Sequence, residues 1–172
     1  MTDADSKEPL RDRLESLFRI RAERVQRERE RREAIRRRRA AFVRAFEQRA
    51  RERVLPAFEE ASGVVEAHGF EGRAREEFAP EEGSPWVRFE MRPADAKEDG
   101  PALGRATLRY VADGPAERIV AERIVGGGDG DAFAQEGQES ERLKLEELTS
   151  ARIEEDLAVL VARAIHVDDA LG

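Results

Sequence analysis

The feature that most constrains this chain is a long run of helix-forming residues near its start. Between Leu10 and Ala61 there is no glycine, and Pro56 is the single proline. Arginine, glutamate, alanine and leucine dominate the run, and all four favour a helix. Four glutamates stand four residues before an arginine, an orientation that stabilises helices. These pairs are Glu15–Arg19, Glu23–Arg27, Glu28–Arg32 and Glu33–Arg37. The run predicts a helix of some 45 residues, about 68 Å long.

The side chains of this helix are typical of only a partial coiled coil. With Leu14 at a heptad a position, apolar residues occupy a and d near the two ends of the run, whereas the middle, from Arg21 to Arg31, is charged. A continuous coiled coil needs apolar a and d positions over three or four heptads. Five large apolar residues at the far end would lie in water in a monomer, which makes them candidates for oligomerisation. They are Leu10, Leu14, Leu17, Phe18 and Ile20.

Charge is distributed unevenly along the chain. The net charge is −7, but residues 1–53 carry +7 and residues 54–172 carry −14. The segment from Arg21 to Arg39 holds ten arginines and four glutamates. Such a helix suits acidic protein surfaces, including that of a sister chain, or nucleic-acid phosphates, and an anionic membrane surface is a further alternative. The candidates for contact with a polyanion are Arg31, Arg32, Arg36, Arg37, Arg38 and Arg39. Arginine outnumbers lysine 28 to 3 in the whole chain, so the arginine count alone is no functional signal.

The periodicity changes in the second part of the chain. From Ala41 onward, apolar residues recur every three or four positions, so this part of the helix is expected to dock on a body. Pro56 is expected to kink or restart the helix, and Gly69 to end it. Shorter alternating runs, separated by turn-rich segments, follow at about 70–78, 87–92, 105–112 and 119–125. They predict a three- or four-stranded antiparallel sheet with one wet face.

A loop to about Glu141 and then a C-terminal helix are expected after the sheet. Thr149 is a good N-cap residue, and an apolar stripe extends from Ile153 to Ile165. The three consecutive acidic residues 154–156 are expected to point away from that stripe into water, so that nothing raises their pKa.

The predicted fold class is therefore α+β. A disordered N-terminus (1–9) precedes a charged helical stalk (10–40) and an α+β head (41–172), in which the C-terminal helix packs on the sheet. The predicted core consists of Phe42, Phe46, Phe58, Val87, Phe89, Leu108, Ile119, Ile153, Leu157 and Leu160.

The sequence contains no constellation that predicts catalysis, cofactor binding or a metal site. Because cysteine is absent, disulfides and thiolate metal sites are excluded. The string from Gly126 to Asp131 lacks the lysine and hydroxyl residue of a phosphate-binding loop, so a connector is expected, with weak cation binding by Asp129 and Asp131 as the alternative. His68 and His166 lie near predicted helix ends, where capping or surface roles are expected.

These observations favour a non-enzymatic, homo-oligomeric scaffold or adaptor, a homodimer or larger, that acts through protein–protein contacts with an unidentified partner. The alternative is a nucleic-acid-binding protein that uses the arginine-rich helix 21–39. An acidic start and the absence of a long apolar run predict no secretory signal, no membrane span and a cytoplasmic location.

Overall fold

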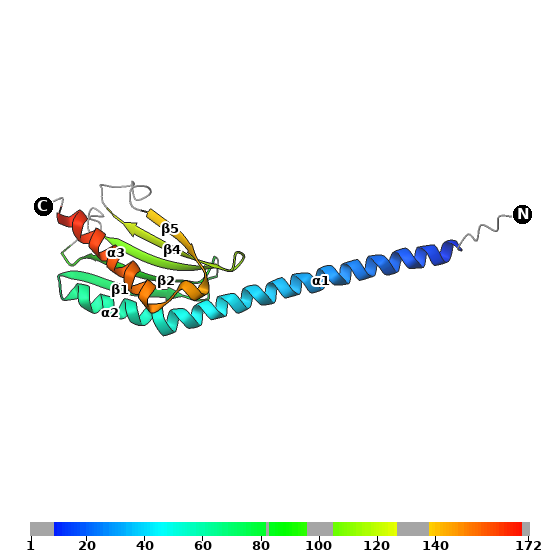
Figure 1. The fold of residues 1–172 in the computed structure, drawn as a ribbon, viewed down its shortest axis with the longest axis horizontal. Coiled ribbons are helices and arrows are strands. Elements are labelled where there is room, and N and C mark those ends of the chain that lie inside the picture. Colours follow the sequence, from blue (N-terminus) through cyan, green and yellow to red (C-terminus); the bar gives the residue numbers. More distant parts are fainter. Residues whose placement is uncertain (1–8, 82, 96–104, 127–137, 170–172) are drawn as a thin grey trace, which may run out of the picture. The chain divides into compact units, whose positions relative to one another are not determined.

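A computed structural model of the chain describes residues 9–81, 83–95, 105–126 and 138–169 (Figure 1). Residues 1–8, for which the sequence predicts disorder, and the greater part of the predicted glycine-rich connector lie outside these ranges. The chain divides into two compact units, residues 1–40 and residues 41–172, and we call the second one the head. The predicted α+β class is confirmed, because a long N-terminal helix precedes an antiparallel sheet and a C-terminal helix.

The first helix, α1, extends from Leu10 to Arg49. Every side chain between residues 17 and 41 is exposed, and between Val25 and Ile35 the helix is polar on all sides. Three of the four predicted ion pairs are present along it: Glu23–Arg27, Glu28–Arg32 and Glu33–Arg37. Glu15 instead pairs with Arg11, at 2.9 Å between carboxylate and guanidinium. Each such exposed pair stabilises the helix by only a few tenths of a kcal/mol.

The helix changes form just before Pro56, which confirms the expected restart. Residues Ala50–Val54 make a π-helical turn, η1, and helix α2 follows over Leu55–Glu66 with Pro56 in its first turn. Proline has no amide hydrogen for the carbonyl four residues earlier, so the α-helical hydrogen bonds cannot continue through it unchanged. Gly69 follows α2 with φ of +86°, the left-handed conformation expected of the glycine that ends a helix.

The head contains a five-stranded antiparallel sheet in the order β1-β2-β3-β4-β5, so each strand pairs with its neighbour in the sequence. The strands are β1 (Phe70–Glu77), β2 (Trp86–Pro93), β3 (Ala106–Asp113), β4 (Arg118–Val125) and β5 (Gln138–Leu143). The first four correspond to the predicted alternating runs. The last one corrects the expectation of a loop up to Glu141: of its six residues only Leu143 is buried, so no hydrophobic alternation marks it.

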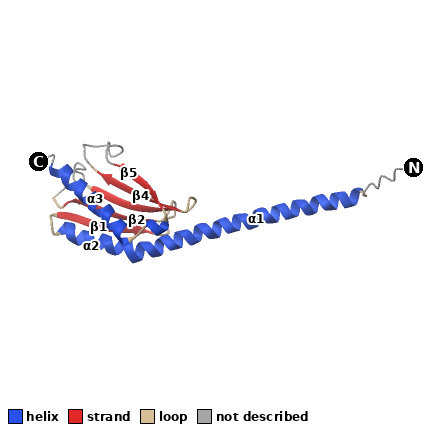
Figure 2. Cartoon of the chain, in the orientation of Figure 1, coloured by secondary structure: helices blue, strands red, loops and turns tan. Residues whose placement is uncertain are grey.

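The helices of the head pack on one face of this sheet. Helix α2 contacts β1 and β2, and the C-terminal helix α3 (Ser150–Asp169) contacts β3 and β4 (Figure 2). A short 3₁₀ turn, η2 (Leu145–Glu147), precedes α3. The amide of Arg152 donates to Thr149 Oγ1 at 3.2 Å, which confirms Thr149 as the N-cap.

The core lies between the helices and the sheet. Nine of the ten predicted core residues are buried, and the tenth, Phe42, is half-buried against them. The Phe58 ring contacts Phe89 and Tyr110, with ring centroids 5.6 and 6.1 Å apart, and so joins α2 to β2 and β3. None of the helices in the described ranges is both long and apolar enough to cross a bilayer.

Candidate interaction surfaces and a buried polar network

The five predicted oligomerisation residues lie on α1 and are all exposed. We call Leu10, Leu14, Leu17, Phe18 and Ile20 the apolar end cluster. Their exposed fractions are 73%, 45%, 62%, 65% and 42%, in that order. At 100° per residue, the three leucines fall on one side of the helix, with Phe18 and Ile20 to either side of them. The cluster is therefore a continuous apolar surface about three turns long.

The six predicted polyanion-contact residues also lie on α1 and are exposed. Because successive residues on a helix point 100° apart, Arg36, Arg37, Arg38 and Arg39 project in four directions. Ion pairs engage Arg32 and Arg37 with glutamates four residues earlier. Four glutamates can neutralise at most four of the ten arginines between residues 21 and 39, so a net charge of +6 remains on this surface however they pair.

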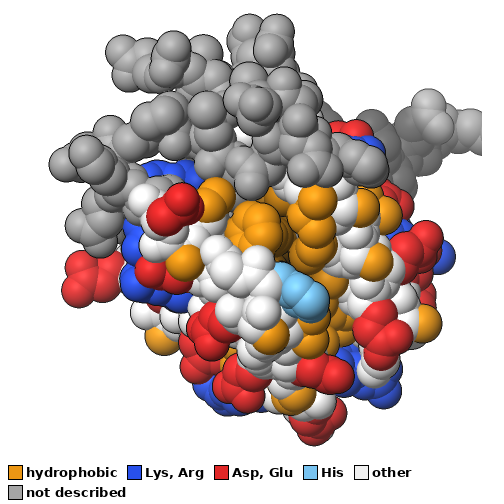
Figure 3. Space-filling model, turned by 90° about the vertical axis from the view of Figure 1, so that its left-hand side faces the viewer, with side chains coloured by type: hydrophobic (Ala, Val, Ile, Leu, Met, Phe, Trp, Pro, Cys, Tyr) orange, Lys and Arg blue, Asp and Glu red, His pale blue; other side chains and the backbone are white. Residues whose placement is uncertain are grey.

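The head presents less exposed apolar surface. Its exposed large apolar side chains, within the described ranges, are Val64 and Ile165. Figure 3 shows apolar side chains in the middle of one face of the head, beside a histidine, with acidic and basic side chains farther out. His68 is exposed beyond the end of α2. Asp129, Asp131 and the side chain of His166 lie outside the described part, in which no group of three acidic or histidine residues is placed to hold a metal ion.

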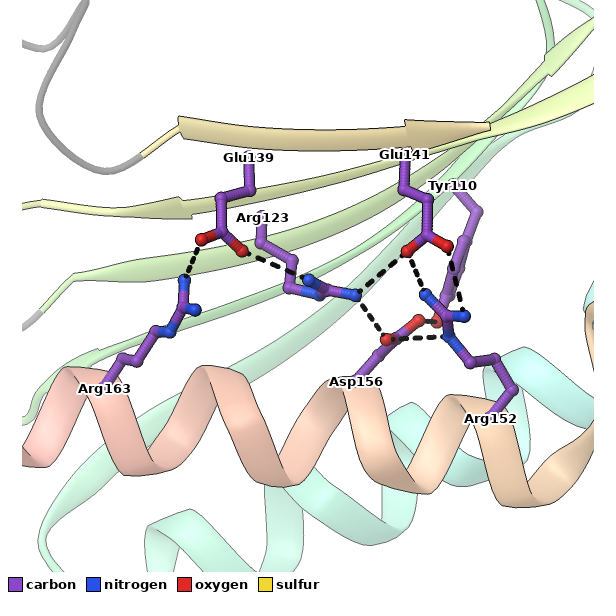
Figure 4. A network of polar contacts seen from close by, with 7 residues as sticks. All are labelled: Tyr110, Arg123, Glu139, Glu141, Arg152, Asp156 and Arg163. Carbon is purple, nitrogen blue, oxygen red and sulfur yellow. Dashed lines mark hydrogen bonds and ion pairs between the residues drawn. The ribbon is translucent and has the colours of Figure 1, made fainter. Parts of the chain in front are cut away.

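Asp156 on α3 is buried, which corrects the expectation that it points into water. It is 1% exposed, whereas its neighbours Glu154 and Glu155 are exposed as predicted. Its Oδ2 accepts a hydrogen bond of 2.6 Å from the Tyr110 hydroxyl. Its Oδ1 accepts from Arg123 Nη2 at 2.7 Å and from Arg152 Nε at 3.0 Å (Figure 4). Both oxygens of this carboxylate are thus occupied by donors from β3, β4 and α3.

A second layer of charges surrounds this centre. Arg152 donates to Glu141 on β5, and Arg123 lies 3.7 Å from the same carboxylate. Glu139, also on β5, accepts from Arg123 at 3.3 Å and pairs with Arg163 of α3 at 2.8 Å (Figure 4). Three arginines face three carboxylates, so the network is neutral. It connects β5 and α3 to the central strands through charged side chains, in addition to the apolar contacts that Leu143 of β5 and the buried face of α3 make in the core.

The network changes how its members titrate. Burial, with the hydrogen bond to Asp156 and the charge of that carboxylate, raises the pKa of Tyr110 far above its ordinary range. The hydrogen bond to Glu141 raises the pKa of Arg152 further above neutrality. Burial acts to lower the pKa of Arg123, but the hydrogen bond and charge of Asp156 outweigh it and raise that pKa. The hydrogen bond from Arg163 lowers the pKa of Glu139.

All these shifts stabilise one protonation state, with arginines charged and the tyrosine neutral, around neutral pH. A carboxylate that is enclosed and fully hydrogen-bonded has no free oxygen with which to accept a substrate's proton. We therefore interpret the network as structural.

Asp156 could have been predicted to be buried from its spacing in the sequence. It lies three residues after Ile153 and four before Leu160, within the i, i+3, i+4 stripe that forms the buried face of α3, and four after Arg152. Its partners on β3, β4 and β5 had no such signal, because their position opposite α3 depends on the pairing of strands.

Comparison with protein-family models, with curated proteins and with solved structures found no match to this chain.

Proposed function

We propose that the protein is a non-enzymatic, homo-oligomeric scaffold or adaptor that acts through protein–protein contacts. The observation that carries the proposal is the apolar end cluster, whose five large side chains are between 42% and 73% exposed in the single chain. A contiguous apolar surface of this kind marks a site of association. A cytoplasmic location, which the sequence predicts, is compatible with this role.

The occupant of the cluster is proposed to be the same cluster of a second copy. Leu10, Leu14 and Leu17 have the d-a-d spacing of a coiled-coil seam, in which identical helices pair leucine against leucine. The seam then meets Arg21 and Arg24, so only a partner with an equally short apolar stretch matches it. A second copy meets that condition without any further assumption.

Charge favours an antiparallel arrangement of the two helices. A parallel pair would bring two segments with a net charge of +6 each alongside one another, well within the Debye length of about 8 Å. In an antiparallel pair centred on the cluster the two segments extend in opposite directions. The arginines then remain available to a third, acidic partner, which is what an adaptor requires.

Light scattering at tens of micromolar tests the proposal. The wild-type chain is expected to have the mass of a dimer or larger assembly, and the double variant Leu14→Glu/Leu17→Glu the mass of a monomer. Val25→Glu is the matched control, because Val25 is 59% exposed on the same helix but outside the cluster. A monomeric wild-type chain would refute the proposal, as would equal masses for the two variants.

A second candidate function is nucleic-acid binding through the segment 21–39. The observation in its favour is the net charge of +6 on a helical surface where every side chain is exposed. Counterion release would make this binding fall steeply with salt.

A gel shift at low salt distinguishes this candidate. Reversing the charges of Arg36, Arg37, Arg38 and Arg39 to glutamate is expected to abolish the shift, while replacing the same four with lysine preserves it, since a phosphate attracts either cation. A shift that survives charge reversal would exclude this segment as the site.

A further inference from the structure

Three arginines stand side by side on the face of the sheet opposite α2 and α3. Arg75 on β1 pairs in register with Arg88 on β2, and Arg88 pairs with Arg109 on β3. We call these three residues the arginine row. Adjacent strands are about 4.8 Å apart. Like charges placed directly opposite one another on a sheet are destabilising, so this arrangement lowers stability rather than adding to it.

The acidic residues around the row do not balance it. Arg75 and Arg88 share Glu90, at 3.6 and 3.1 Å. Arg109 lies 3.6 Å from Glu122, and its buried Nε has no hydrogen-bond partner in the described structure. Farther along the same face, Arg73 and Arg92 share Glu71. Five arginines thus divide three glutamates among them, although residues 54–172 carry a net charge of −14.

The same face carries the single tryptophan of the chain. The guanidinium carbons of Arg88 and Arg109 lie 5.0 and 5.3 Å from the centre of the Trp86 ring, and Trp86 Nε1 donates to Glu77 at 3.0 Å. The indole and the two guanidinium planes are therefore held in place, half-exposed, before any ligand arrives.

A hollow adjoins the row on this face. Its volume is about 380 Å³, within the range of ligand pockets. Four arginines line it with two glutamates, a threonine and an isoleucine: Arg73, Arg75, Arg92, Arg105, Glu71, Glu90, Thr107 and Ile124. Four cationic side chains thus outnumber two carboxylates in this hollow, and a hydroxyl and apolar surface lie beside them.

We propose that this face, centred on the arginine row and Trp86, binds single-stranded nucleic acid. Arginine pairs with phosphate through two parallel hydrogen bonds, and both indole and guanidinium planes stack on unpaired bases. A duplex keeps its bases inside and does not offer them for stacking. An acidic peptide satisfies the charges but leaves the tryptophan without a role. The site lies wholly on the head, so this proposal does not depend on self-association through the apolar end cluster.

Trp86 provides the test: it is the single tryptophan of the chain, so tryptophan fluorescence reports on this face alone. The full-length chain is titrated with oligo-dT of about 16 nucleotides at low salt, then with a duplex of equal length and with polyglutamate. A saturable change in emission is expected with the single strand. If three phosphates are contacted, a fourfold rise in salt weakens binding about 20-fold. The duplex and polyglutamate are expected to bind at least tenfold more weakly.

Variants locate the site. Arg75→Gln/Arg109→Gln removes the two outer members of the row and relieves its repulsion, so binding is expected to weaken at least tenfold while the thermal midpoint is maintained. Arg44→Gln/Arg53→Gln is the matched control, with two exposed arginines removed from the helical layer of the head. Trp86→Ala, followed by anisotropy of a labelled strand, is expected to weaken binding about tenfold, with Trp86→Phe recovering most of it.

Several results would overturn the proposal. One is the absence of any emission change with the single strand at low salt. Another is a response of equal affinity with polyglutamate, which would assign the face to an acidic polypeptide. The third is a response that survives Arg75→Gln/Arg109→Gln but disappears when residues 36–39 are reversed in charge, which would move the binding to α1.

Discussion

Three consecutive acidic residues of one helix have different surroundings in this protein. Glu154 and Glu155 point to solvent, while Asp156 is enclosed. Composition gave the three the same expectation, although the helical angle of Asp156 places it beside Ile153 and Leu160. A buried carboxylate is stable only with donors for its oxygens. Those donors come from Tyr110 and Arg123, whose proximity to α3 is a property of the folded sheet, so sequence reasoning had no means to find them.

The charge of Asp156 is expected to be essential for stability. Asp156→Asn preserves the shape of the side chain but leaves Arg123 and Arg152 without their shared counter-charge. Breaking such a buried pair is expected to lower the free energy of unfolding by roughly 3–5 kcal/mol. Urea unfolding measures this change. Glu155→Gln, next to it on the solvent side, is the control and is expected to cost no more than about 0.5 kcal/mol. Equal effects of the two changes would contradict the structural role of the network.

Tyr110 gives a pH prediction that can be observed directly, because it is the only tyrosine of the chain. Burial and Asp156 raise its pKa above the ordinary value of 10.0. The stability that this neutral hydroxyl contributes is therefore complete below pH 10 and is lost as pH rises toward the folded pKa.

Near-ultraviolet absorbance of tyrosinate measures this ionisation. We expect no tyrosinate in the folded chain at pH 10 and its appearance together with the loss of secondary structure at higher pH, whereas in urea ionisation occurs at the ordinary pKa. Tyrosinate that forms near pH 10 in a chain with native circular dichroism would show that the hydroxyl is not held by Asp156.

At the scale of elements, α1 follows from its helix-forming composition, whereas α2, α3 and the first four strands follow from periodicity because each has an apolar side to bury. Strand β5 does not, since the positions that face α3 are Glu139 and Glu141 rather than apolar residues. These glutamates bind arginines of β4 and α3, so the strand is held by ion pairs that a hydropathy pattern does not register. Its polar sequence is typical of a loop.

The contact of α2 with β1 depends on Gly72. A Cβ at this position would lie 2.6 Å from Ser62 Cα and 2.8 Å from Val65 Cγ2, and the first of these is backbone. Gly72→Ala is therefore expected to destabilise the head by about 1–3 kcal/mol. Gly63→Ala is the matched control, because Gly63 lies in α2 and a Cβ there would have no atom within 4 Å. This substitution is expected to stabilise the head by about 0.5–1 kcal/mol. Thermal melts of both variants measure this, and a neutral Gly72→Ala would exclude the close packing.

At the scale of the whole molecule, the surfaces on α1 could be predicted from the sequence, whereas the surface on the sheet could not. The apolar end cluster and the arginine-rich segment 21–39 lie on one continuous helix, so their exposure follows from spacing along it. The arginine row depends on the registers of β1, β2 and β3, in which residues 13 and 21 positions apart become neighbours. Local patterns predict a wet face of the sheet but not which side chains meet on it.

The head and residues 1–40 are expected to differ in local stability. Self-association is expected to change the protection of only one part of residues 1–40. Amides of β2, β3 and β4 are expected to be the most protected from hydrogen exchange, because they lie in the middle of the sheet over the core. In residues 21–39 no side chain is buried, so exchange there is expected to be fast at all concentrations.

Residues 11–20 are the part expected to respond to concentration. If copies join through the apolar end cluster, protection of these amides rises as the chain is concentrated from nanomolar to tens of micromolar, while residues 21–39 stay unchanged because Arg21 and Arg24 interrupt the seam. Leu14→Glu/Leu17→Glu is expected to abolish the rise and Val25→Glu to preserve it. A rise that extends equally through residues 21–39 would mean a continuous coiled coil, and no rise at all would remove the cluster as the site of association.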